Sequence, residues 1–213
     1  MNISCRSLTY CCLSWNVPLL VALIVTSTAA PVQATFHEWR ITELYSNASG
    51  TVQFIELGLP SSGLDNESFV GGHTITDSAL SHTFTFPSNT VSIPTNSAHL
   101  LIATPGYTLL SGVPTADYVL PTNDFFSTSG DTINYSTGIS VVTFPQPNLP
   151  TNGTNSLNFD PFGSSSPFIA VNSLTNLAGQ TGSISVPEPS TLSLLGSGAI
   201  GLLVCARRRW VKA

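Results

Sequence analysis

Residues 40–59, with the sequence RITELYSNASGTVQFIELGL, decide the fold class of this chain. Polar and apolar side chains alternate through Phe36–Tyr45, which is the period-two pattern of a strand. The next residues, Asn47-Ala48-Ser49-Gly50, are turn formers, and the run Thr51–Leu59 follows them. We therefore expect two strands that either form a hairpin or lie as neighbours in one sheet.

Short runs of this kind recur along the rest of the chain. Each run is bounded by Gly, Pro, Asn or Asp, and residues 36–182 show no sustained period of 3.6 residues. Many short strands with frequent turns and no helices are typical of a β-sandwich. Further strands are expected at Gly72–Asp77, His82–Phe86, Ala98–Thr104, Asp117–Leu120, Asp131–Tyr135, Ile139–Phe144, Ser156–Phe159 and Phe168–Val171.

Two motifs at the start of this region resemble the opening of the lamin-tail domain. Ile41–Leu44 reads Ile-x-Glu-hydrophobic, and Phe54–Leu57 contains hydrophobic-Glu-hydrophobic. The resemblance extends from Phe36 to about Asn176 and implies an immunoglobulin-like β-sandwich that serves as a binding or scaffold module. We expect this sandwich over residues 35–176, followed by a flexible spacer of small residues over 177–185. Later stretches similar to that family are residues 75–77, 84–87, 98–102, 130–133 and 153–157.

The charge of the chain is low and unevenly distributed. The 213 residues carry a formal charge of −5, and only 8% of them are charged. Between Thr35 and Ser185 the only strong base is Arg40, so this part is clearly acidic. We expect no nucleic-acid binding on this ground unless a divalent cation bridges, because phosphate backbones need Lys and Arg to neutralise them. The carboxylates of this part are Glu38, Glu43, Glu56, Asp65, Glu67, Asp77, Asp117, Asp124, Asp131 and Asp160.

The four cysteines lie outside the expected sandwich, at Cys5, Cys11, Cys12 and Cys205. No disulfide framework can therefore hold the domain together. Its stability must come from an apolar core, which about 150 residues are enough to build.

The N-terminal segment Met1–Ala34 has the features of a secretory signal peptide. Arg6 supplies a weakly basic start, Val17–Val25 is the apolar core, and small residues precede Ala34. We expect export by the Sec machinery and cleavage after Ala34, with Ala30 as a second option. An uncleaved membrane anchor is the alternative.

The C-terminal segment has three parts in order. Val186-Pro187-Glu188-Pro189-Ser190 is held extended by its prolines, Leu192–Cys205 has no charge and no proline, and Arg207-Arg208-Arg209 is basic. Counted from about residue 190 to 206, the apolar part approaches the lower limit for crossing a bilayer. The arginines should stay on the cytoplasmic side as a stop-transfer signal.

These three parts resemble the PEP-CTERM sorting domain, over residues 186–213. The resemblance implies a bacterial envelope protein that an exosortase-type membrane transpeptidase cuts near Pro187–Pro189. It also implies transient anchoring in the membrane, then a place at the cell surface or in the extracellular matrix, with exopolysaccharide as a candidate partner. The alternative is an ordinary C-terminal membrane anchor.

Glu43 and Glu56 are the most conspicuous carboxylates, since each lies among apolar residues on an expected strand. A buried carboxylate needs a partner. The pair is a candidate acid site, or part of a Ca²⁺ site with Asp65 or Asp77. The alternative, which we favour, is that each orders backbone at the sheet edge or faces water.

Other candidate sites are weaker. Asp65-Asn66-Glu67 and Asn123-Asp124 are oxygen-rich loops without EF-hand spacing. Gly196–Gly201 matches G-x-G-x-x-G but lacks the strand and acidic residue of a dinucleotide site. The histidines lack zinc-site spacing, although His73 and His82 could meet across a hairpin.

The sequence therefore predicts a non-enzymatic surface protein with no catalytic residue, metal or cofactor. The alternative is an exported, metal-assisted hydrolase that uses acidic loops. A close pair of carboxylates or a bound cation in a cleft would favour the hydrolase, whereas shallow surface grooves over a filled core would favour the binding module.

Overall fold

The computed structural model describes residues 37–186 except 62–66, 91–93, 95–96, 146–148 and 164–165, together with Ser197, Gly198 and Ile200. All of them belong to the unit formed by residues 34–213. Within residues 37–186 the described elements are strands and one short 3-10 helix. They are β1 (Arg40–Ser46), β2 (Gln53–Gly58), β3 (Thr74–Asp77), β4 (Thr83–Thr85), β5 (His99–Ala103), η1 (Tyr107–Leu109), β6 (Tyr118–Val119), β7 (Asp131–Tyr135), β8 (Ser140–Phe144), β9 (Asn155–Asn158), β10 (Phe168–Val171), β11 (Leu174–Thr175) and β12 (Thr181–Gly182).

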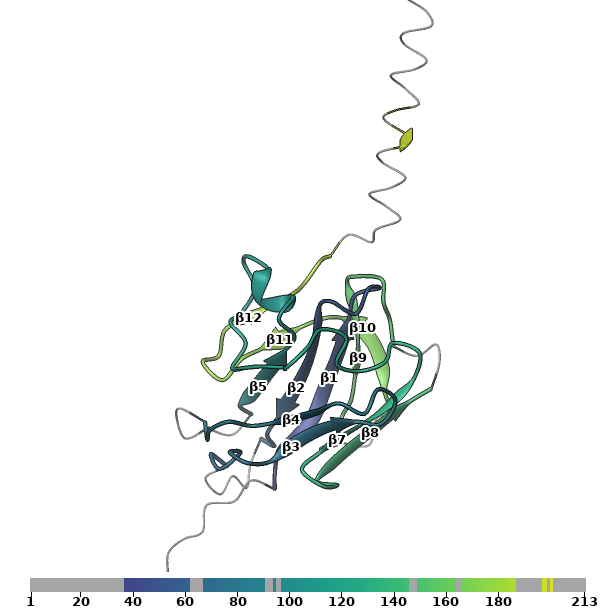
Figure 1. The fold of residues 1–213 in the computed structure, drawn as a ribbon. Helices are drawn as coiled ribbons and strands as arrows, with labels where there is room; N and C mark the ends of the chain where they lie inside the picture. Colours follow the sequence, from purple (N-terminus) through teal and green to yellow (C-terminus); the bar gives the residue numbers. More distant parts are fainter. Residues whose placement is uncertain are drawn as a thin grey trace, which may run out of the picture. The chain divides into compact units, whose positions relative to one another are not determined.

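The strands form two main sheets, which Figure 1 shows as two layers. One sheet has six strands in the order β10-β9-β1-β2-β5-β6, and the other has four in the order β4-β3-β7-β8. Pairing is antiparallel in both sheets except for the parallel pair β5–β6. β1 and β2 form the hairpin that was one of the two expected arrangements, and Gly50 provides the positive φ of its turn at 70°.

A β-bulge in β1 decides which side chains face each side of the six-stranded sheet. Ile41 pairs with Leu57 and Glu43 pairs with Glu56, so Thr42 is an extra residue. The shift lets both Ile41 and Leu44 pack into the core between the sheets. Glu43 consequently lies on the opposite face, beside Glu56.

The main core fills the space between the two sheets. Trp39, Leu44 and Ile55 of the six-stranded layer meet Ile133 and Tyr135 of the other layer, and all five are fully buried. The indole N–H of Trp39 donates to the backbone oxygen of Glu67 at 2.8 Å, so this large side chain is satisfied as well as buried.

A second core lies on the outer face of the six-stranded sheet. Tyr45, Phe54, Leu101 and Tyr107 pack there against Leu174 and Ile184, and each is nearly or fully buried. The segment that covers them, Asn172–Val186, contains β11 and β12 and is called the strap below. Figure 1 shows these two strands next to β5.

The strap includes residues 177–185, which composition predicted to be a flexible spacer, so the structure differs from the prediction there. Its first residues, 172–176, fall within the predicted sandwich. β11 pairs with β12, and Ile184 is buried. Small polar residues resemble a linker in sequence, but here Asn172 and Asn176 use their amides to bond backbone. The packed domain therefore extends to Val186 rather than to residue 176.

The prediction of an all-β sandwich is confirmed at the level of fold class. Each expected strand is present within a few residues, as β1 to β10, and Asp131–Tyr135 and Phe168–Val171 match at both ends. Sequence reasoning missed β11 and β12, which have only two residues each. Strands this short carry no readable period.

The two terminal predictions fall outside the described residues. These are the signal peptide Met1–Ala34 and, at the other end, Pro187–Ser190, most of the apolar segment, and Arg207–Arg209. In the part of the chain that the structure describes, no helix is both long enough and apolar enough to span a bilayer.

Replacing Phe54 by Ala tests the second core. The Phe54 ring stacks on Tyr45 with centroids 5.3 Å apart and meets Tyr107 edge-on at 6.5 Å. Loss of a fully buried Phe should lower the free energy of unfolding by about 3–5 kcal/mol, measured by urea denaturation. Leu109→Ala, at a side chain that is 85% exposed, should change it by less than about 0.5 kcal/mol. A Phe54→Ala loss as small as the control's would show that the outer face is not a packed core.

Candidate functional site

Three carboxylates on the outer face of the six-stranded sheet hold the strap by its backbone. Glu43 accepts the N–H of Ser173 at 3.1 Å, and Glu56 accepts that of Thr175 at 2.6 Å. Asp117 accepts the N–H of Leu177 at 3.0 Å and also that of Leu101 at 2.8 Å. Residues 173, 175 and 177 alternate, as expected when every second N–H of an extended segment points the same way.

Glu43 and Glu56 form a close pair, because they are cross-strand partners on β1 and β2. Each is only 3% exposed. Burial raises the pKa of Glu43 to about 7, a hydrogen bond from Ser156 acts against this, and the neighbouring Glu56 raises the pKa further. Two adjacent buried carboxylates favour a state in which one of them keeps its proton.

His99 links this pair to the protein surface. Its Nδ1 lies 2.8 Å from Glu56 Oε1, and its side chain is 34% exposed. The hydrogen bond to Glu56 raises the pKa of His99, against the opposite effect of partial burial. The hydroxyl of Thr42, the bulge residue, also donates to Glu56 Oε1 at 3.3 Å.

Three other carboxylates in the domain have similar roles at loops. Glu67 accepts the N–H of Glu38, and Asp77 accepts that of Leu80. Asp131 accepts the N–H groups of Ala79 and Ser127. These side chains order backbone, as Glu43 and Glu56 do. The prediction placed those two at the sheet edge or facing water, whereas they are buried on the two central strands of the sheet.

The structure does not bring together the ligands of the Ca²⁺ site considered for Glu43 and Glu56. Asp77 belongs to the four-stranded sheet, where it bonds the turn before β4, and Asp65 lies outside the described residues. Across the described ranges, no group of three His, Cys, Asp or Glu side chains is arranged to hold a metal ion.

The histidines do not form a shared site either. The backbone of His73 pairs with Phe86, whereas that of His82 pairs with Asp77, so the two do not face one another across the hairpin. His73 bonds the hydroxyl of Ser136 at 3.0 Å, and His82 Nδ1 bonds the backbone oxygen of Phe125 at 2.8 Å.

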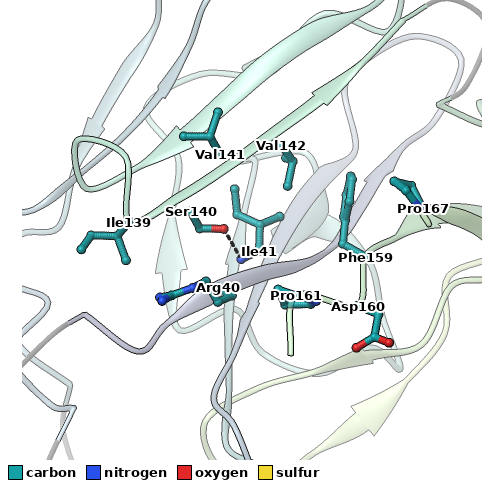
Figure 2. Close-up of a pocket in the computed structure, with 10 residues that line it drawn as sticks. All are labelled: Arg40, Ile41, Ile139, Ser140, Val141, Val142, Phe159, Asp160, Pro161 and Pro167. Carbon is teal, nitrogen blue, oxygen red and sulfur yellow. Dashed lines mark hydrogen bonds between the residues drawn. The ribbon is translucent and has the colours of Figure 1, made fainter. Parts of the chain in front are cut away.

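One hollow is an open pocket of about 300 Å³ between β8 and the segment after β9 (Figure 2). Arg40 and Asp160 lie at separate parts of its rim, and Val142 and Phe159 supply apolar wall. The Ser140 hydroxyl accepts the N–H of Ile41 at 3.0 Å. No His lines this pocket, so Ser140 has no base beside it there.

A second hollow of about 300 Å³ continues from the first, since both are lined by Pro167. Leu157 and Phe168 line it together with Phe144 of β8. β8 and β10 are the outermost strands of their sheets, so the two hollows follow the open side of the sandwich.

Comparison with known families gives one match. Residues 185–209 match the PEP-CTERM protein-sorting motif. The chain carries a PEP-CTERM sorting motif. It marks an exported protein that an exosortase-type membrane enzyme processes, with transient membrane anchoring before surface display. No curated protein matches the chain significantly.

The match covers the predicted motif residues Val186, Pro187, Glu188, Pro189 and Ser190 and the predicted stop-transfer residues Arg207, Arg208 and Arg209, and it ends before the predicted end of the signal at residue 213. Of these motif and stop-transfer residues Val186 lies in the described part, and the others lie outside it, as does Ala34. Sequence reasoning identified Glu43 and Glu56 as candidate site residues, but it did not single out Asp117 or His99. Nothing near Asp117 in sequence signals a partner 60 residues away.

The titrating groups beneath the strap make folding stability depend on pH. Glu43 has a pKa of about 7 in the folded protein against a usual 4.5, so the folded state keeps a proton that the unfolded state loses between these values. The stability from Glu43 therefore falls as the pH rises through this window. His99 changes the folding stability in the same direction. The stability that comes from its raised pKa is present below pH 6.5 and is lost as the pH rises through the pKa of the folded protein.

Glu43→Gln isolates this effect, since glutamine is neutral at every pH. We expect the variant to be close to the wild type at pH 5. At pH 8 it should be more stable, by on the order of 3 kcal/mol, in urea denaturation of purified protein. Asp124→Asn makes the same chemical change at an exposed carboxylate and is the matched control. Parallel pH profiles for Glu43→Gln and the wild type would contradict this account of the pair.

Proposed function

We propose that this chain is an exported envelope protein whose β-sandwich acts as a non-enzymatic binding or scaffold module. The single observation that carries the proposal is the PEP-CTERM motif at residues 185–209, which follows the packed domain without a spacer. In this proposal the Sec machinery exports the chain, and signal peptidase cleaves after Ala34. The exosortase-type enzyme recognises Pro187–Pro189, and Arg207–Arg209 retains the tail in the membrane until cleavage.

The use of the buried carboxylates supports a non-enzymatic role. Glu43 and Glu56 are a close pair, which on sequence grounds would favour a hydrolase. They lie beneath the strap, however, and accept N–H groups of Ser173 and Thr175. A general acid or base must reach the proton that it transfers, and these two reach their own chain. The alternative of a metal-assisted hydrolase receives no support from the described residues.

The same two residues support the lamin-tail-like assignment of the sandwich. Glu43 and Glu56 are the glutamates of the two motifs that resemble that family, and they are adjacent on β1 and β2. Their contacts with the strap explain why each motif contains a glutamate without invoking catalysis.

An apolar strip on β10 supports a binding role. Phe168, Ile169 and Val171 are exposed by 50%, 54% and 67% on the outermost strand of the six-stranded sheet. Natural edge strands are usually protected by charge or proline, and here only Pro167 precedes the strip. Exopolysaccharide at the cell surface is a candidate ligand for such a module. Nucleic acid is not a candidate, because Arg40 is the only strong base between Thr35 and Ser185.

Intact mass of the protein from its native host tests the proposal. The wild type should lack everything after about residue 189, because the sorting enzyme removes the membrane tail. Pro187→Ala combined with Pro189→Ala should retain Arg207–Arg209, since the recognition triplet is lost. Pro145→Ala combined with Pro161→Ala, at two exposed prolines of the sandwich, is the matched control and should be processed normally. If the wild type also retains Arg207–Arg209, the segment is only an anchor and the sorting proposal fails.

A further inference from the structure

Val186 belongs to two parts of the protein at once. It lies within the matched sorting motif, and it is also a packed residue of the sandwich. Its N–H donates to the backbone oxygen of Gly153 at 3.0 Å, and its side chain packs against the second core. The folded domain thus continues directly into the recognition triplet.

The last part of the strap is fixed at Ile184 through both of its backbone polar groups. The side-chain amide of Asn172 accepts the N–H of Ile184 at 2.6 Å and donates to the oxygen of Ile184 at 2.8 Å. The Ile184 side chain is buried among Tyr45, Phe54 and the other residues of the second core. The backbone polar groups and the side chain of Ile184 are therefore occupied while the strap is closed, although Ser183 and Ser185 on either side are exposed.

The turn between β11 and β12 is fixed in the same way. Asn176 accepts the N–H of Gln180 at 2.9 Å through its side chain and donates to the oxygen of Thr115 at 2.9 Å. Gly179 takes the positive φ of 75° that the turn needs. Together with the three carboxylate contacts, these bonds attach the strap at several points between Asn172 and Val186, while residues 178–181 of the turn are exposed.

A processing enzyme binds its substrate as an extended, unpaired chain, so hydrogen-bonded segments are protected until they open. Five residues, 187–191, separate Val186 from the apolar segment at Leu192. At roughly 3.5 Å per residue they reach about 20 Å when extended. Opening the strap would add residues 172–186, or about 50 Å of accessible chain.

We propose that the closed strap sets the upstream limit of sorting, so that the enzyme cleaves on the C-terminal side of Val186 and the strap stays on the mature domain. In that step one peptide bond breaks, its carbonyl carbon bonds to water or to the nucleophile of an acceptor, and the departing nitrogen takes a proton. This inference rests on the proposed sorting function. Glu43 and Glu56 position the strap by accepting the N–H groups of Ser173 and Thr175.

The first test is the C-terminal residue of the mature protein, from intact mass and terminal peptide sequencing in the native host. The wild type and Ile184→Val should both end at residue 187 or later. Ile184→Asp places a charge in the second core and should open the strap without altering the core between the sheets. That variant should yield additional C-termini within residues 172–186. A wild-type C-terminus upstream of Val186 overturns the inference.

The second test uses the full-length, unprocessed protein in detergent and does not depend on the sorting enzyme. Limited digestion with proteinase K should leave a wild-type fragment that ends near residue 186. For Ile184→Asp the fragment should end near residue 172, and Ile184→Val should behave as the wild type does. If the wild-type fragment loses the strap as quickly as the tail, the inference is overturned.

These two tests separate the two proposals. Retention of Arg207–Arg209 in the host refutes the sorting function, and proteinase K digestion still decides whether the strap protects the chain up to Val186. Complete digestion of Ile184→Asp would mean that this variant does not fold. In that case the fragments of the wild type and Ile184→Val decide whether the strap is protected.

Discussion

Hydrogen bonds from backbone N–H groups to buried carboxylates are the interaction on which the arrangement of this domain depends. A buried charge needs compensation, and in most proteins a cation or several hydrogen bonds supply it. Between Thr35 and Ser185 this chain has Arg40 as its only strong base. Each of Glu43, Glu56 and Asp117 accepts a main-chain N–H of the strap. His99 adds a side-chain partner for Glu56, and the N–H of Leu101 adds a second main-chain partner for Asp117.

This constraint explains why the six-stranded sheet is buried on both sides at its centre. Every residue of β2 is buried, with Ile55 and Leu57 facing the other sheet and Phe54 facing the strap. An antiparallel sheet in a sandwich often leaves its outer face in water. Here the carboxylates and the aromatic side chains beside them need a cover, and the strap provides both N–H donors and apolar side chains.

In the proposed function, the strap also connects the stability of the domain to its processing. A flexible spacer would separate the folded module from its sorting signal, and each could then act alone. Because Val186 is packed, the recognition triplet begins where the fold ends. The raised pKa values of Glu43 and His99 both make the folded domain more stable toward acidic pH.

The sequence by itself determined the strand content and the sorting motif, because both are local. Alternation in Phe36–Tyr45, turn residues at Asn47–Gly50 and the order of Pro187–Pro189 before an apolar run are readable within a short window. Only the tertiary structure decided the pairing of Glu43 with Glu56, through the bulge at Thr42, and the fate of the strap. Ser173 and Thr175 meet carboxylates that lie 130 and 119 residues earlier in the chain. Such contacts leave no local period or composition, so small polar residues that resemble a linker in sequence become part of a core once the sheet beneath them has formed.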